Sequence, residues 1–377
     1  MESTARDSSA PASSSPAQAL INWDLAASTA ARLASAGPTL NSAEIGEAVD
    51  SLRRLADASV PHVHEITGLE AARDLRDSSV LVVDRASWAK ANTQSFAVML
   101  KPAMQKMLDT RRGNLSPAAA QVSGAITGSQ LGAVLAFLSS KVLGQYDPFS
   151  ALAENSTAPA SGRLLLVAPN IISVERELNV EPADFRLWVC LHEQTHRVQF
   201  AAAPWLRHHM LQEIENLSGL LLGNVDSLLE RASAAAKSLK DRAAPGAAPG
   251  RGAILDLLQD PEEKAALSRL TALMSLLEGH ANVVMDAVDA SIVPSVKTIR
   301  QRFNDRGQER GMIEKFIRNL LGRDAKMRQY SDGAKFVREV VAAAGMAGFN
   351  RVWESAENLP SEPEIHDSKL WLDRMGL

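Results

Sequence analysis

Two histidines and a glutamate near the middle of the chain have the residue types and spacing of a catalytic zinc site. His192, Glu193 and His196 form a His-Glu-x-x-His pattern within a segment that favours one amphipathic helix. Residues four apart lie on one face of a helix, so both imidazoles can point at one metal ion. Glu193 lies one position further round, where it can reach a water on that metal and act as its general base. The pattern therefore predicts zinc-assisted hydrolysis.

A helix that carries these polar residues on its surface is the alternative interpretation. The flanking residues argue against it because they are apolar on both sides of the pattern: Leu187, Trp188, Val189, Leu191, Val198 and Phe200. Two imidazoles and a carboxylate in a buried place need a partner, which a metal ion supplies. Arg197 departs from the commonest metallopeptidase pattern, which has an uncharged residue at this position.

A second apolar segment, Leu276–Asp286, supplies the best candidate for a third ligand. A catalytic zinc needs three protein ligands and one open position for water. We predict Glu278 as the third ligand, with Asn282 or Asp286 orienting the ligands through hydrogen bonds. His280 points elsewhere on the helix; it is the alternative ligand or, if it does not ligate, a donor to the developing oxyanion. Ordinary solvation of one helix face is the alternative interpretation of this segment.

The elements that position these residues are predicted to be mostly helices. The chain of 377 residues is 46% hydrophobic, 22% charged and only 5% aromatic, which favours a globular, helical protein. The motif helix is expected to begin at Pro182 and to end before Pro204. Two apolar runs, 79–84 and 164–168, predict strands. By analogy with peptidases that bind extended substrate against an edge strand, the run at 164–168 is placed for that task. The expected fold class is mainly α with a small β-sheet.

The apolar run at 122–143 is predicted to be a buried packing helix. Gly124, Gly128 and Gly132 recur at steps of four, which lets a neighbouring helix approach closely. Polar residues interrupt the run, so it is too polar for a membrane span. We therefore expect no membrane segment.

Three other groups of residues carry no predicted site. His62 and His64 are placed in a loop where nothing nearby completes a metal site. Cys190 points roughly 200° away from His192 on the helix, so it is expected to be a core residue. The basic run after Ser295 is expected to be a solvated face; it contains Arg300, Arg302, Arg306, Arg310, Lys315 and Arg318.

Composition and charge limit the partners and the compartment. A net charge of −4 and a pI near 6.1 give no electrostatic footprint for nucleic acid or an anionic membrane. The single cysteine excludes an intrachain disulfide and fits a reducing cytosol. Residues 1–18 are rich in Ser, Ala and Pro without a signal-peptide core, so we expect a disordered tail and a cytoplasmic protein. A flexible Ala/Pro/Gly loop is expected at about 243–252.

Longer segments of the chain resemble a known family. They are His192-Glu193-Gln194-Thr195-His196-Arg197-Val198-Gln199-Phe200 followed by Pro204-Trp205, Leu277-Glu278-Gly279-His280, Lys326-Met327-Arg328-Gln329-Tyr330, Phe349-Asn350-Arg351-Val352-Trp353 and Asn358-Leu359-Pro360. From about Ile21 onward the chain is similar to an actinobacterial family of zinc-dependent metalloproteases. That family also carries the label of uncharacterised proteins associated with deazaflavin-coenzyme biosynthesis, which is an association and predicts no reaction.

The resemblance implies a single zincin-like catalytic domain over 19–377. Its Zn²⁺ would be held by a gluzincin-like set of ligands, His192, His196 and Glu278, with Glu193 as the catalytic base. The implied fold is a mainly helical, zincin-like metallohydrolase.

The predicted function is zinc-assisted hydrolysis of an amide in a peptide or protein substrate. In other zinc peptidases a Tyr or His across the cleft stabilises the oxyanion, and Tyr330 or His280 could fill that role here. One alternative is a non-catalytic, zinc-stabilised binding or scaffold protein, although a purely structural site needs no base such as Glu193. Another alternative is hydrolysis of a small non-peptide amide.

Overall fold

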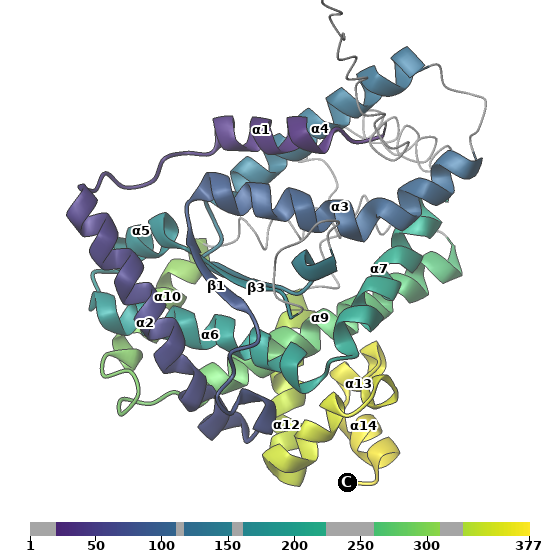
Figure 1. Cartoon of the computed structure of the whole chain (residues 1–377). Coiled ribbons are helices and arrows are strands. Elements are labelled where there is room, and N and C mark those ends of the chain that lie inside the picture. The colour runs from purple at the N-terminus through teal and green to yellow at the C-terminus, as the bar shows by residue number, and fades with distance from the viewer. Residues whose placement is uncertain (1–19, 111–116, 153–160, 224–259, 310–326) are drawn as a thin grey trace, which may run out of the picture.

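The computed structural model describes residues 20–110, 117–152, 161–223, 260–309 and 327–377. These residues form a mainly helical structure with one three-stranded sheet (Figure 1), as predicted. The predicted tail at 1–18 and the loop at 243–252 lie outside the described residues. The main elements are α1 Trp23–Leu33, α2 Ser42–Thr67, β1 Ser79–Val83, α3 Arg85–Thr110, α4 Pro117–Ser139, β2 Gly144–Asp147, β3 Arg163–Val167, α5 Ala168–Leu178, α6 Pro182–Ala202, α7 Leu206–Gly223, α9 Pro261–Ala287, α10 Val296–Glu309, α12 Met327–Asn350, α13 Glu362–His366 and α14 Ser368–Met375.

The sheet has the strand order β1-β3-β2, so its central strand is β3, which contains most of the predicted strand at 164–168. β3 pairs parallel with β1 and antiparallel with β2. Both predicted strands are therefore present, but the prediction that 164–168 offers an edge to substrate is wrong. The edges of the described sheet are β1 and β2, and β2 is the edge that packs against α6. The Gly-Gln-Tyr-Asp sequence of β2 lacks the β-branched pattern that marks a strand.

β3 separates two hydrophobic clusters. Leu166 belongs to the larger cluster, on the side of α6, whereas Leu165 and Val167 belong to a smaller cluster with Trp88 of α3 and Leu135 of α4. Successive residues of a strand point to opposite faces, so a strand that is buried on both faces is a continuous apolar run. The larger cluster continues through α6 and α9 into α12 and α14. The motif helix therefore lies within the main core.

Helices cover both faces of the sheet. In Figure 1 the sheet lies between α3 on one side and α2 and α6 on the other, and α1 and α4 lie beyond α3. The α9 helix packs against α6, α7 and α12. These contacts bring the two segments that carry the predicted ligands side by side.

The glycine stripe of α4 packs against α1. A Cβ atom at Gly128 would lie 2.4 Å from the carbonyl oxygen of Asn22, and one at Gly132 would lie 2.5 Å from that of Ala26. Both distances are far inside van der Waals contact, so this approach requires glycine, and the predicted close packing is confirmed. The prediction that the whole helix is buried is wrong, because four of its large apolar side chains are exposed: Val122, Ile126, Val134 and Phe137. By length and hydropathy, Val122–Ser139 of α4 is the one described helix that could cross a membrane.

His62 and His64 lie in a helix, so the prediction of a loop there is wrong. α2 continues through Pro61 and ends at Thr67. Residues two apart on a helix point roughly 200° away from each other, so the two imidazoles do not share a metal site.

The first part of the basic run after Ser295 caps helices, so the prediction of a merely solvated face is wrong there. Arg300 donates to the carbonyl oxygen of Val288 at 2.7 Å, at the end of α9, and Arg302 donates to that of Leu178 at 2.8 Å, at the end of α5. The last turn of a helix leaves its carbonyl oxygens without intrahelical partners, and guanidinium groups satisfy them. Residues 310–326 of the run lie outside the described residues.

Candidate metal centre

The apolar side of α6 fixes the helix in the core. Pro182 occupies its first turn, where the missing N–H costs no hydrogen bond. Phe185, Val189 and Val198 are at most 2% exposed and belong to the larger hydrophobic cluster. Cys190 is also fully buried, as predicted for a core residue. This packing sets the rotation of α6 about its axis and directs its polar side toward α9.

Glu278 of α9 meets both motif histidines. Its Oε2 lies 4.0 Å from Nε2 of His192, and its Oε1 lies 3.8 Å from Nε2 of His196. The two imidazole rings stand at 87° to each other with centroids 4.9 Å apart. One possible ligand atom from each of the three residues lies within 4.8 Å of the other two.

The three side chains fit a zinc ion by donor type and by spacing. Tetrahedral ligands about 2.1 Å from zinc lie about 3.4 Å from one another, so side-chain shifts of less than about 1 Å would complete the geometry. His192, His196 and Glu278 are 28%, 16% and 31% exposed. Among the described residues the group offers three possible ligand atoms and is partly exposed, so a metal held there would keep a position open to water.

Glu193 is held beside this cluster by the edge strand. It is 7% exposed, and a Cβ atom at Gly144 of β2 would lie only 2.5 Å from its Cγ. Burial raises the pKa of Glu193 to about 7, with the charge of His196 lowering it and that of Glu278 raising it. A carboxyl group with this pKa can both accept and return a proton near neutral pH.

Gln199 bridges α6 and α9, although it lies outside the His-Glu-x-x-His pattern that predicts the metal site. Its Oε1 lies 3.0 Å from Nδ1 of His196. Its Nε2 donates to the carbonyl oxygen of Leu277 at 2.8 Å and lies 3.1 Å from Nδ1 of His280. The spacing of three residues from His196 was the available signal, because such residues are neighbours on a helix surface.

His280 lies outside the cluster of ligand atoms. The residue is fully buried, and its ring packs against Phe349 and Trp353 with centroid separations of 5.2 and 5.3 Å. Burial, together with the charge of His196, lowers the pKa of His280 to about 3. The structure therefore places a neutral imidazole behind Gln199, away from the cluster that contains Glu278.

The predicted orienting role of Asn282 or Asp286 is wrong. Both residues are exposed, and Asp286 pairs with Arg338 of α12 at 3.0 Å. Steps of four residues turn about 40° each on a helix, so the stripe that starts at Glu278 winds away from α6 into solvent. Tyr330 lies in the first turn of α12, but its side chain is outside the described part of the chain, so its oxyanion role stays a prediction.

The unusual Arg197 links α6 to the sheet. It is 2% exposed, and its Nε donates to the carboxylate of Asp77 at 2.8 Å. Its Nη1 also donates to Gln194 at 3.3 Å. Asp77 lies just before β1, so the buried charge of Arg197 is paired with a carboxylate at the start of the sheet. This ion pair is the structural reason for a charged residue at position 197.

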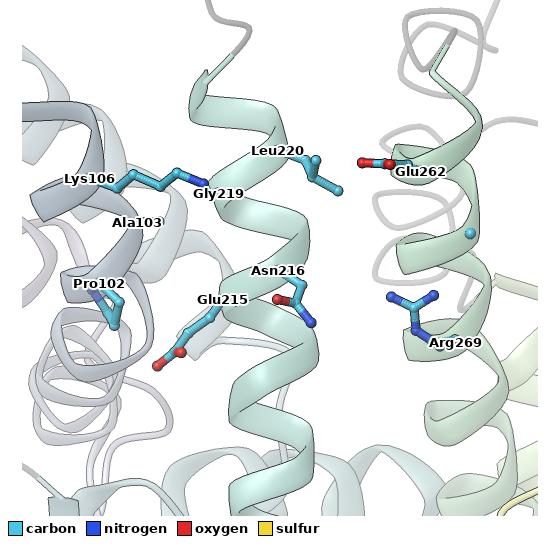
Figure 2. A pocket seen from close by; sticks show the side chains of 10 residues that line it. Pro102, Ala103, Lys106, Glu215, Asn216, Gly219, Leu220, Glu262 and Arg269 are labelled. Atoms are coloured by element: carbon cyan, nitrogen blue, oxygen red, sulfur yellow. The ribbon is translucent and has the colours of Figure 1, made fainter. Parts of the chain in front are cut away.

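A separate cavity of about 500 Å³ lies between α3, α7 and α9. In Figure 2, Asn216 of α7 and Arg269 of α9 extend toward each other across it. Side chains of both charges line the cavity, among them Lys106, Glu215 and Glu262, and none of the three possible metal ligands does. The metal centre is therefore defined by its donor atoms and not by this cavity.

The fold and the cluster together define the chain as a metallohydrolase: a mainly helical protein in which a His-Glu-x-x-His helix meets a glutamate of a second helix. A family model described as zincin-like metallopeptidase matches residues 21–372, and the chain belongs to that family. The chain is also similar to a solved structure from Chloroflexus aurantiacus described as "a putative hydrolase with a novel fold". The two are 32% identical with a TM-score of 0.66, and the match covers 95% of this chain and 99% of the other. No curated protein matches the chain.

Proposed function

We propose that this chain is a zinc-dependent hydrolase that cleaves amide bonds in peptides or proteins. The observation that carries the proposal is the position of Glu193 beside three converging donor atoms. His192, His196 and Glu278 would hold the ion. A bound zinc ion supplies a Lewis acid that polarises the scissile carbonyl and lowers the pKa of a water molecule. Glu193 accepts a proton from that water and passes it to the leaving nitrogen.

The edge strand supports a peptide as the substrate. The N–H of Val167 donates to the carbonyl of Leu143 at 2.8 Å, and antiparallel pairing alternates from there. The backbone groups of Gly144 and Tyr146 consequently point away from β3. An extended peptide can add to such an edge through main-chain hydrogen bonds, and here it would pass beside Glu193. A small non-peptide amide would leave these groups unused.

We further propose a single catalytic domain over 19–377 in a cytoplasmic protein that binds neither nucleic acid nor membrane. The family match over residues 21–372 supports one domain. The net charge of −4 and the single, buried cysteine support the choice of compartment and partners.

Glu193→Gln tests the proposal. The variant should retain zinc, because the three donor atoms remain, and should lose hydrolysis of a synthetic peptide library read by mass spectrometry. Glu181→Gln, at an exposed position before the same helix, is the matched control and should retain activity. Full activity of Glu193→Gln would refute the mechanism. Zinc binding without any cleavage by the wild type would favour the non-catalytic scaffold.

A further inference from the structure

We propose that Gln199 is a positioning residue that fixes the tautomer of His196 for metal binding and couples the two ligand helices. The inference rests on the metal centre proposed above but not on turnover. Gln199 is fully buried on the last turns of α6, and both ends of its amide have partners. One end contacts a ligand residue, His196, and the other contacts the backbone next to the ligand Glu278.

The hydrogen bonds determine the orientation of the amide. The carbonyl oxygen of Leu277 can only accept, so the group 2.8 Å from it must be the NH₂ of Gln199. The other end is then the amide oxygen, which can only accept. Nδ1 of His196, 3.0 Å away, must therefore carry a proton and donate it.

This assignment prepares His196 for a metal. In a neutral imidazole only one nitrogen carries hydrogen, so protonation of Nδ1 leaves the lone pair on Nε2. Nε2 is the atom that lies 3.8 Å from the Glu278 carboxylate, in the cluster of ligand atoms. A ligand histidine held through its other ring nitrogen binds metal better because its tautomer and ring orientation are set in advance.

His280 supports this arrangement from behind. Its Nδ1 accepts the second N–H of the Gln199 amide at 3.1 Å, which places its own hydrogen on Nε2. That Nε2 is buried and has no hydrogen-bond partner among the described residues. A phenylalanine would fill the space between Phe349 and Trp353 without leaving a buried N–H unpaired, so the acceptor function of His280 toward Gln199 is what its imidazole contributes.

The experiment compares Gln199→Leu with Gln194→Leu in the full-length protein. Gln194 is a fully buried glutamine of the same helix, but its amide contacts Ala56 and Arg197, away from the ligand atoms. Zinc affinity is measured by competition with a chromophoric chelator, after circular dichroism has shown that each variant is folded. We expect Gln199→Leu to weaken zinc binding by about 10- to 100-fold and Gln194→Leu to leave it unchanged.

Two further measurements separate positioning from general stability. In Gln199→Glu the carboxylate still accepts from His196 but cannot donate to Leu277, so zinc affinity should recover to within about threefold of the wild type while thermal stability falls. The ¹H–¹⁵N spectrum of the metal-free wild type should show His196 protonated on Nδ1, and the Gln199→Leu spectrum should not show that single tautomer. Unchanged zinc affinity in Gln199→Leu, equal losses in both leucine variants, or a wild-type His196 protonated on Nε2 would overturn the inference.

None of these readouts requires hydrolysis. A zinc-binding wild type that cleaves no peptide would refute the proposed function and leave this inference standing. An active wild type whose zinc affinity does not depend on Gln199 would do the reverse.

Discussion

Replacing Glu193 by glutamine should stabilise the metal-free protein, and the gain should grow with pH. Glu193 is 7% exposed, and burial raises its pKa from 4.5 to about 7. Between these two values the folded protein holds a proton that the unfolded chain has released. The free energy of unfolding of the wild type therefore falls as the pH rises from 4.5 to 7. Glutamine has nearly the same shape and does not titrate.

The size of the effect follows from the difference in pKa. A carboxyl group whose pKa rises by this amount on folding costs the folded state about 3 kcal/mol once the pH is above 7. His192 and His280 have the opposite effect on the pH dependence of stability. Folding lowers their pKa values from 6.5 to about 4 and about 3, so they destabilise the folded state as the pH falls below 6.5. The wild type and Glu193→Gln both contain these histidines, so the difference between their free energies of unfolding isolates the contribution of Glu193.

The assay is urea denaturation with a chelator present, at several values from about pH 5 to about pH 8. The stability gained by Glu193→Gln should be small at the acidic end and approach about 3 kcal/mol at the alkaline end. Glu47→Gln, at an exposed position of α2, is the matched control for the removal of a carboxylate. A Glu193→Gln difference that is constant with pH, or that grows on acidification, would refute the assignment of a buried, protonated carboxyl.

Two glycine positions give further tests of how the site is held. A Cβ atom at Gly279 would lie 2.3 Å from the backbone of Gly333, so Gly279→Ala should push α9 away from α12. In a urea titration this variant should show a free energy of unfolding that is lower by about 1–3 kcal/mol. The control is Gly219→Ala, which has open space around it and should not destabilise the protein. Gly144→Ala should displace Glu193 and slow peptide hydrolysis by about 10- to 100-fold, while chelator competition shows unchanged zinc affinity. Normal peptide hydrolysis in Gly144→Ala would show that β2 does not position the base.

The half of the site on α6 could be predicted because it depends on local periodicity alone. His192 and His196 share a helix face wherever the helix packs, and the apolar flanks indicate that it is buried. The choice between Glu278 and His280 could not be made in the same way. These residues point roughly 200° apart, so the rotation of α9 decides which one meets α6. Close packing of Gly279 against α12 restrains that rotation, and this contact leaves no periodic signal in the sequence.

The edge strand and its contact with the base were missed for a related reason. β2 is four residues long and has no β-branched side chain, so it is a strand only because β3 pairs with it. Nothing in the local sequence indicates that Gly144 lies against Glu193, because the two residues are 49 positions apart and meet only when α6 packs beside the sheet.

Gln199 shows how far local geometry constrains the site. Its contact with His196 follows from a spacing of three residues, but the direction of its amide is set by Leu277 and His280 on α9. A shift of α9 would therefore move the Gln199 amide and change the orientation of the His196 ring, even if Glu278 kept its own position. The five-residue pattern specifies which atoms can bind the metal, whereas the α6–α9 interface determines how accurately those atoms are presented to it.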